Sequence, residues 1–85
     1  RSYMLYEEYV YFQIEPSQMT FVNRIVEGVD HIGVLTALDG KRGIAFLRTT
    51  ADTAAEVREL LRDLPISVRF LTYKEALAEK RDTLR

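Results

Sequence analysis

Apolar residues alternate along some stretches of the chain and recur with helical spacing along others, and these two patterns predict its elements in order. Alternation predicts a first strand over 8–14, with Val10, Phe12 and Ile14 on one face. A helical stripe predicts a helix over 17–27, with Ser17 as N-cap and Gly28 as C-cap. The apolar positions of that helix are Phe21, Val22, Ile25, Val26 and Val29.

Two further apolar runs flank a turn and predict a β-hairpin with strands over 31–38 and 43–49. Asp39-Gly40 is among the strongest short-range signals for a hairpin turn. We expect Gly40 to supply the positive φ of the reversal and Gly43 to host a bulge where the strands pair again.

The second half of the chain repeats the helix and strand pattern and ends in a charged segment. Thr53 and Glu56 have the spacing of a capping box, and Pro65 ends the helix that follows them. The buried stripe of this helix is Val57, Leu60, Leu61 and Leu64. A last strand is predicted over 66–72, and the segment 73–85 has the composition of a solvated helix. A helix that covers apolar sheet surface is the alternative for that segment.

This order of elements, β-α-β-β-α-β, predicts the ferredoxin-like sandwich, an α+β fold. Right-handed crossovers favour an antiparallel sheet with the strand order 4-1-3-2 and both helices on one face. We expect one domain over 1–72 followed by a helical tail over 73–85.

The other face of the predicted sheet has no helix from this motif and carries large apolar side chains. Contiguous exposed apolar patches of this kind usually mark an interaction site. We therefore expect this face to be covered, by a second copy of the chain, by the tail helix or by a ligand, and we expect a homodimer or a larger homo-oligomer through the sheet. The interface residues are Tyr9, Tyr11, Ile44, Phe46, Arg48, Arg69 and Leu71.

The predicted topology also gathers polar loops at one end of the sheet. The turn after the first strand, the hairpin tip and the turn after the second helix share this end, while His31 lies at the other. Cationic side chains beside a helix N-terminus favour a carboxylate or a phosphate. The residues of this candidate effector site are Glu15, Ser17, Gln18, Lys41 and Arg42.

Composition narrows the classes of function. The chain has 85 residues, no cysteine and a formal net charge of −1. Without cysteine, disulfides and thiolate metal sites are excluded, and an intracellular, cytoplasmic location is favoured. The near-neutral charge gives no electrostatic reason to expect nucleic acid as a partner. No apolar run approaches the roughly 20 residues that span a bilayer.

No motif of a known enzyme class is present, so we expect no catalytic residues, no metal and no cofactor. One histidine with scattered carboxylates has no metal-ligand spacing, and no serine lies in a nucleophile motif. The glycines match neither the phosphate-loop nor the dinucleotide spacing. Acylphosphatases share the architecture, but their loop after the first strand carries glycine and arginine, whereas this chain has Glu15-Pro16-Ser17-Gln18.

An RNA-binding module is the alternative from another class. The segment 42–49, Arg-Gly-Ile-Ala-Phe-Leu-Arg-Thr, partly resembles the third-strand signature of RNA-recognition motifs. In that interpretation Phe46 and Tyr11 are the rings on which bases stack.

Over roughly 8–71 the chain resembles the ACT-like group of small ferredoxin-like regulatory domains and a small bacterial domain family of unknown function. The resemblance is carried by Glu15-Pro16-Ser17, by the tip Asp39-Gly40-Lys41-Arg42-Gly43 and by the helix end at Leu64-Pro65. In ACT domains an acidic residue, a proline and a glycine open the first helix, and amino acids bind there at a dimer interface. In this chain, Ser17 occupies the position where ACT domains have that glycine. The resemblance implies a non-enzymatic regulatory module that binds a small anionic or amino-acid effector, or a partner protein, as a homo-oligomer.

Overall fold

The computed structural model describes residues 7–29 and 32–84 of the chain. His31 lies outside these residues. The elements, in order, are β1 (Glu7–Gln13), the 3₁₀ helix η2 (Pro16–Gln18), α1 (Met19–Glu27), β2 (Val34–Asp39), β3 (Ile44–Thr50), α2 (Ala54–Arg62), β4 (Arg69–Leu71) and α3 (Tyr73–Leu84).

The four strands form one antiparallel sheet in the order β2-β3-β1-β4. This order is the predicted 4-1-3-2 counted from the other edge, and the α+β arrangement is compatible with a ferredoxin-like fold. β1 and β3 are the central pair, with Val10 opposite Leu47 and Tyr11 opposite Phe46. The hairpin β2-β3 therefore supplies one central strand and one edge strand.

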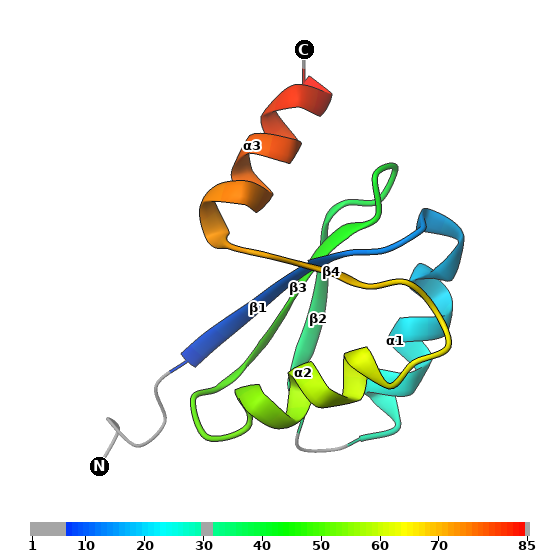
Figure 1. Cartoon of the computed structure of the whole chain (residues 1–85), viewed down its shortest axis with the longest axis vertical. Coiled ribbons are helices and arrows are strands. Elements are labelled where there is room, and N and C mark those ends of the chain that lie inside the picture. The colour runs from blue at the N-terminus through cyan, green and yellow to red at the C-terminus, as the bar shows by residue number, and fades with distance from the viewer. Residues whose placement is uncertain (1–6, 30–31, 85) are drawn as a thin grey trace.

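Both α1 and α2 lie on the same side of the sheet (Figure 1), and the main core fills the space between them and the strands. Phe12 and Leu47 from the sheet and Val22 and Leu61 from the helices are completely buried there. These side chains come from the apolar faces that alternation and helical spacing predicted. Phe21, the first residue of the predicted stripe on α1, is exposed instead.

α3 continues directly from β4 and packs its first turns on the opposite face of the sheet. Its Ala76 is completely buried against Ile44 and Leu71. The rest of α3 extends past the sheet (Figure 1). The first part of α3 therefore covers apolar sheet surface, which was the alternative prediction for this segment, and the burial of Ala76 attaches it to the sheet.

The hairpin turn differs from the prediction in the position of its special glycine. Gly43, not Gly40, has a positive φ, of 73°. The register shift lies in the partner strand, between Ala37 and Asp39, rather than at Gly43. The Asp39 carboxylate accepts hydrogen bonds from the N–H groups of Lys41 and Arg42 at 3.1 and 3.3 Å, so its side chain closes the loop.

The start of each predicted helix also needs correction. Ser17 lies inside η2 rather than at an N-cap; α1 begins at Met19, and its N-cap residue Gln18 makes no side-chain hydrogen bond to the helix. Thr53 is the N-cap residue of α2 but forms no capping box with Glu56. Its hydroxyl is engaged instead by Thr50, accepting from the Thr50 N–H at 3.3 Å and donating to the Thr50 carbonyl.

A capping box does exist, at the beginning of α3. The Thr72 hydroxyl accepts from the Glu75 N–H at 3.1 Å, and the Glu75 carboxylate accepts from the Thr72 N–H at 2.8 Å. Each side chain satisfies a backbone N–H that the helix leaves without a partner. This start fixes the direction in which the chain leaves β4 and brings Ala76 down on the sheet.

The last strand is shorter than predicted, because its partner ends. Arg69 pairs with Gln13, so continuing the register would place Ser67 opposite Glu15 and Ile66 opposite Pro16. β1 has already turned away at that point into η2. Ile66 and Val68 nevertheless pack against the main core, as alternation predicted.

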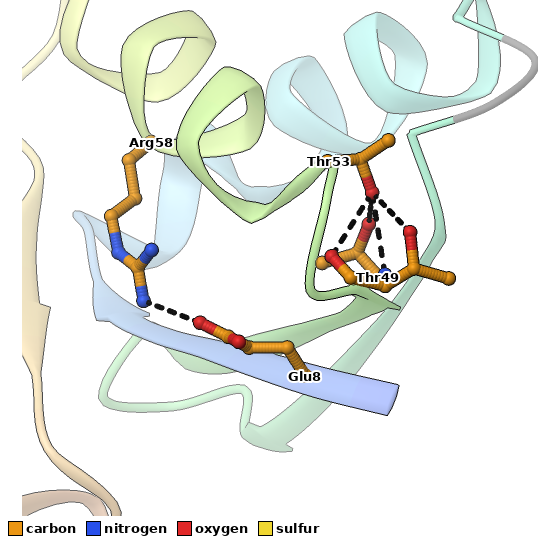
Figure 2. A network of polar contacts seen from close by, with 5 residues as sticks. Glu8, Thr49, Thr53 and Arg58 are labelled. Carbon is orange, nitrogen blue, oxygen red and sulfur yellow. Dashed lines mark hydrogen bonds and ion pairs between the residues drawn. The ribbon is translucent and has the colours of Figure 1, made fainter. Parts of the chain in front are cut away.

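At the other end of the sheet, polar contacts attach α2 to the strands (Figure 2). Thr49 and Thr53 are joined through their hydroxyls, and Arg58 donates to the Glu8 carboxylate at 3.3 Å. Nearby, the Thr50 hydroxyl donates to the Asp52 carboxylate at 2.6 Å, and this bond lowers the pKa of Asp52. These contacts attach the start of α2 to the end of β3, and Arg58 of α2 to β1.

Candidate functional site

The sheet face opposite α1 and α2 divides into a covered half and an open half. α3 covers the half near the hairpin tip, where Ile44 and Leu71 are buried with Ala76, and Tyr11 and Leu38 pack at their margin. Ile44 and Leu71 were predicted as exposed interface residues, and the structure corrects that prediction. Their apolar surface is already used within the chain.

The open half is formed by three strands and keeps its apolar side chains in water. Tyr9 of β1 is 38% exposed and Val34 of β2 is 55% exposed. With Thr36, Phe46 and Arg48 they line a hollow of about 200 Å³. Tyr9, Phe46 and Arg48 therefore lie together as predicted, and the edge strand β2 adds two residues that the prediction did not include.

Aromatic rings connect the two halves of this face. The Phe46 ring centroid lies 5.3 Å from that of Tyr9 and 5.6 Å from that of Tyr11, and the Tyr73 ring of α3 lies 5.6 Å from Tyr11. Burial raises the pKa of the Tyr11 phenol, and the neighbouring phenols of Tyr73 and Tyr9 add to the rise. Tilted pairs at these distances contribute about 0.5–1.5 kcal/mol each beyond their buried area. The rings form a continuous cluster in which Tyr11 and Phe46 are half-buried and the outer rings, Tyr9 and Tyr73, are exposed.

The polar end of the sheet, by the hairpin tip, contains a second hollow of about 330 Å³. Glu15, Lys41 and Arg42 of the predicted effector site line it, together with Gln13, Ile14, Pro16 and Ser67. Ser17 and Gln18, the last two residues of η2, do not line it. The topology thus brings together three of the five predicted residues, with side chains of both charges around one opening.

Gln13 holds the floor of this hollow in place. Its amide nitrogen donates to the Arg42 carbonyl at 3.0 Å, and its amide oxygen accepts from the Arg69 guanidinium at 2.9 Å. Arg69, predicted at the open face, therefore lies at the border between that face and the polar end. The side chain of Gln13 thus links β1 to the hairpin loop and to β4.

A third hollow, of about 220 Å³, lies on the helix side of β2. Met19, Thr20 and Asn23 of α1 line it with Leu35 and Ala37 of β2. None of these residues was predicted from the sequence as part of a site. One sequence feature could have indicated this hollow. The run Val34-Leu35-Thr36-Ala37 carries no charge, and the predicted strand order already placed it at the edge of the sheet.

Among residues 7–29 and 32–84, no group of histidine and carboxylate side chains is placed to hold a metal ion. In the same part of the chain, no helix has the length and apolar character needed to cross a bilayer.

Comparison with known proteins gave one result. The sequence model of a family described as a domain of unknown function (DUF4911) matches residues 12–68. Neither the curated proteins nor the solved structures gave a match. The matched segment begins inside β1, includes the hairpin and both helices of the main core, and ends just before β4.

Proposed function

We propose that this chain, which belongs to the DUF4911 family of domains of unknown function, is a non-enzymatic protein-interaction module that works as a homo-oligomer. One observation carries the proposal. α3 covers the half of the sheet face near the hairpin tip, whereas the other half keeps Tyr9 and Val34 in water around a hollow. Burial of such apolar area gives about 25 cal/mol per Å², so a second copy that covers part of this half stabilises the assembly.

The oligomeric state of the full chain tests this proposal. Light scattering at micromolar concentration is expected to give the mass of a dimer or a larger oligomer for the wild type. Val34→Glu is expected to give a monomer that stays folded, because the new carboxylate lies opposite Arg48 within the same chain but cannot be buried against a second copy.

Phe21→Glu is the matched control for this substitution. Phe21 is also an exposed apolar residue, but it belongs to α1 and lines none of the three hollows. We expect its oligomer to have the wild-type mass. A wild type that is monomeric across the concentration range contradicts the proposal, and binding of single-stranded RNA through Phe46 at low salt would replace it.

The polar end supports a second role, the binding of a small effector. A free amino acid carries one carboxylate and one ammonium group, and the hollow at the hairpin tip offers Lys41 and Arg42 to the first and Glu15 to the second. Glu15 and Lys41 are exposed, so the hollow is open to a small molecule. The effector class is therefore a zwitterion rather than a simple anion.

Thermal unfolding with a panel of free amino acids, with inorganic phosphate as comparison, tests this second role. An amino acid at ten times its Kd is expected to stabilise the chain by about 1.4 kcal/mol, which is a rise in Tm of roughly 5–10 °C. Arg42→Ala is expected to abolish the rise, and Arg24→Ala on α1 to keep it. An unchanged Tm with every amino acid, or an equal rise with phosphate, contradicts a zwitterion site.

A further inference from the structure

The two edges of the sheet are unequal among the described strands. β4 has three residues, whereas β2 has six. Proteins usually protect an edge strand by making it short or by placing lysine or proline in it. β2 has neither lysine nor proline, and its only charged residue, Asp39, stands at its end. The register shift of the hairpin lies beyond Ala37, so the first four residues of β2 remain regular.

The hydrogen-bond pattern shows which backbone groups of β2 point outward. The Ile14 N–H donates to the Gly43 carbonyl at 2.9 Å, so Gly43 directs its backbone groups to β1. Since these directions alternate along an antiparallel strand, Phe46 and Arg48 direct theirs to β2. Their partners Thr36 and Val34 are thereby engaged, and Leu35 and Ala37 point their N–H and C=O groups away from the sheet.

Hollows flank this edge on both faces. On the helix side, Leu35 and Ala37 border the hollow beside α1; on the open side, Val34 and Thr36 border the hollow beside Phe46. A strand added to β2 would place alternate side chains beside Leu35 and Ala37 on one face and beside Val34 and Thr36 on the other. Main-chain hydrogen bonds with pockets for alternate side chains are the features of strand addition to a sheet edge.

We propose that the strand added to β2 is the β2 strand of a second copy, paired antiparallel about a two-fold axis at Thr36. This proposal rests on the homo-oligomer proposed above and names its interface. In this register Leu35 of each copy exchanges hydrogen bonds with Ala37 of the other, so the outward backbone groups satisfy one another. Thr36 faces its own counterpart, and Val34 faces Leu38, so every pair is apolar or threonine.

The two-fold axis also accounts for the unequal halves of the sheet face. Antiparallel pairing places the α3-covered end of one sheet, where Leu38 lies, beside the open end of the other, where Val34 lies. The most exposed apolar side chain of β2 thus meets an apolar residue of the second copy. A second copy therefore satisfies the outward backbone groups of the edge and covers Val34, which borders the hollow on the open face.

Single cysteine variants test the register, since the chain contains no native cysteine. Directly opposed residues of a non-hydrogen-bonded pair have Cα atoms ~4.5 Å apart, within the about 4.4–6.8 Å that a disulfide spans. Thr36→Cys is therefore expected to form a disulfide-linked dimer under mild oxidation at least about tenfold faster than Ala37→Cys. Ala37 is equally exposed but faces Leu35 rather than its own counterpart.

Ala37→Pro provides a second measurement that needs no oxidation. It removes an outward N–H without removing a bond between β2 and β3, so the chain is expected to fold and to be monomeric, whereas Ala37→Ser stays oligomeric. Equal crosslinking of the two cysteine variants, or an unchanged mass for Ala37→Pro, overturns the β2 pairing while the wild-type oligomer stands. A monomeric wild type removes the proposed function itself, so the two failures are distinguishable.

Discussion

Gly43→Ala is expected to lower the free energy of unfolding by roughly 2–4 kcal/mol. At φ 73° an L side chain is strained, and a Cβ at this position would collide with the Ile14 carbonyl oxygen and lie 3.2 Å from the Pro16 nitrogen. Neither neighbour can yield, because both are backbone and the Gly43 carbonyl accepts the Ile14 N–H. Urea denaturation monitored by circular dichroism measures the loss.

Gly40→Ala is the control for this substitution. Gly40 lies in the same turn, has no positive φ, and a Cβ added there meets nothing within 4 Å. We expect its free energy of unfolding to equal that of the wild type within about 0.5 kcal/mol. Equal losses for the two alanine variants would show that the close approach of the hairpin to β1 is not what Gly43 provides.

Phe12→Ala is expected to cost about 3–5 kcal/mol, because it empties a completely buried position between the sheet and the two helices. Phe46→Ala removes the same side chain from the open face, where the ring is half-buried and pairs with two tyrosine rings, and is expected to cost about 1–3 kcal/mol in a monomer. Thermal or urea unfolding of both variants below the concentration of assembly measures the difference. Comparable losses would mean that the open face holds the fold together and is not reserved for a partner.

The faces of the strands could be predicted from the sequence because burial on one side of a sheet follows the two-residue period. Val10 and Phe12 are buried under α1 and α2, and Tyr9 and Tyr11 lie on the other face, as alternation requires. The sheet order followed from the order of elements and the handedness of the crossovers. These features depend on regularities that extend over many residues.

The helix starts could not be predicted, because several local signals were equivalent. Thr53 and Thr72 are each followed three residues later by glutamate, but only Thr72 forms the capping box. The hydroxyl of Thr53 is taken by Thr50 and Thr49, which reach it only because β3 ends beside α2. The choice between the two threonines is thus made by tertiary contacts.

Part of the candidate effector site could be predicted because its residues are brought together by the order of the elements. Glu15, Lys41 and Arg42 meet because the topology brings their loops to one end of the sheet, whereas Ser17 and Gln18 depend on the local path of η2. Ile44 and Leu71 were expected at the interface because the charged composition of the tail favoured a solvated helix over the covering helix, to which Ala76 belongs. Val34 and Thr36 were not predicted as site residues, because their own sequence does not show which half of the face α3 leaves uncovered.

Amide hydrogen exchange read by NMR tests most directly whether two copies of the chain pair through the outward backbone groups of β2. At low concentration the Leu35 and Ala37 amides are expected to exchange quickly, while the Val34 and Thr36 amides, bonded to β3, are protected. At concentrations at which the chain assembles, the Leu35 and Ala37 amides are expected to become protected as well. Fast exchange of these two amides in the assembled protein would contradict the pairing of β2 with β2.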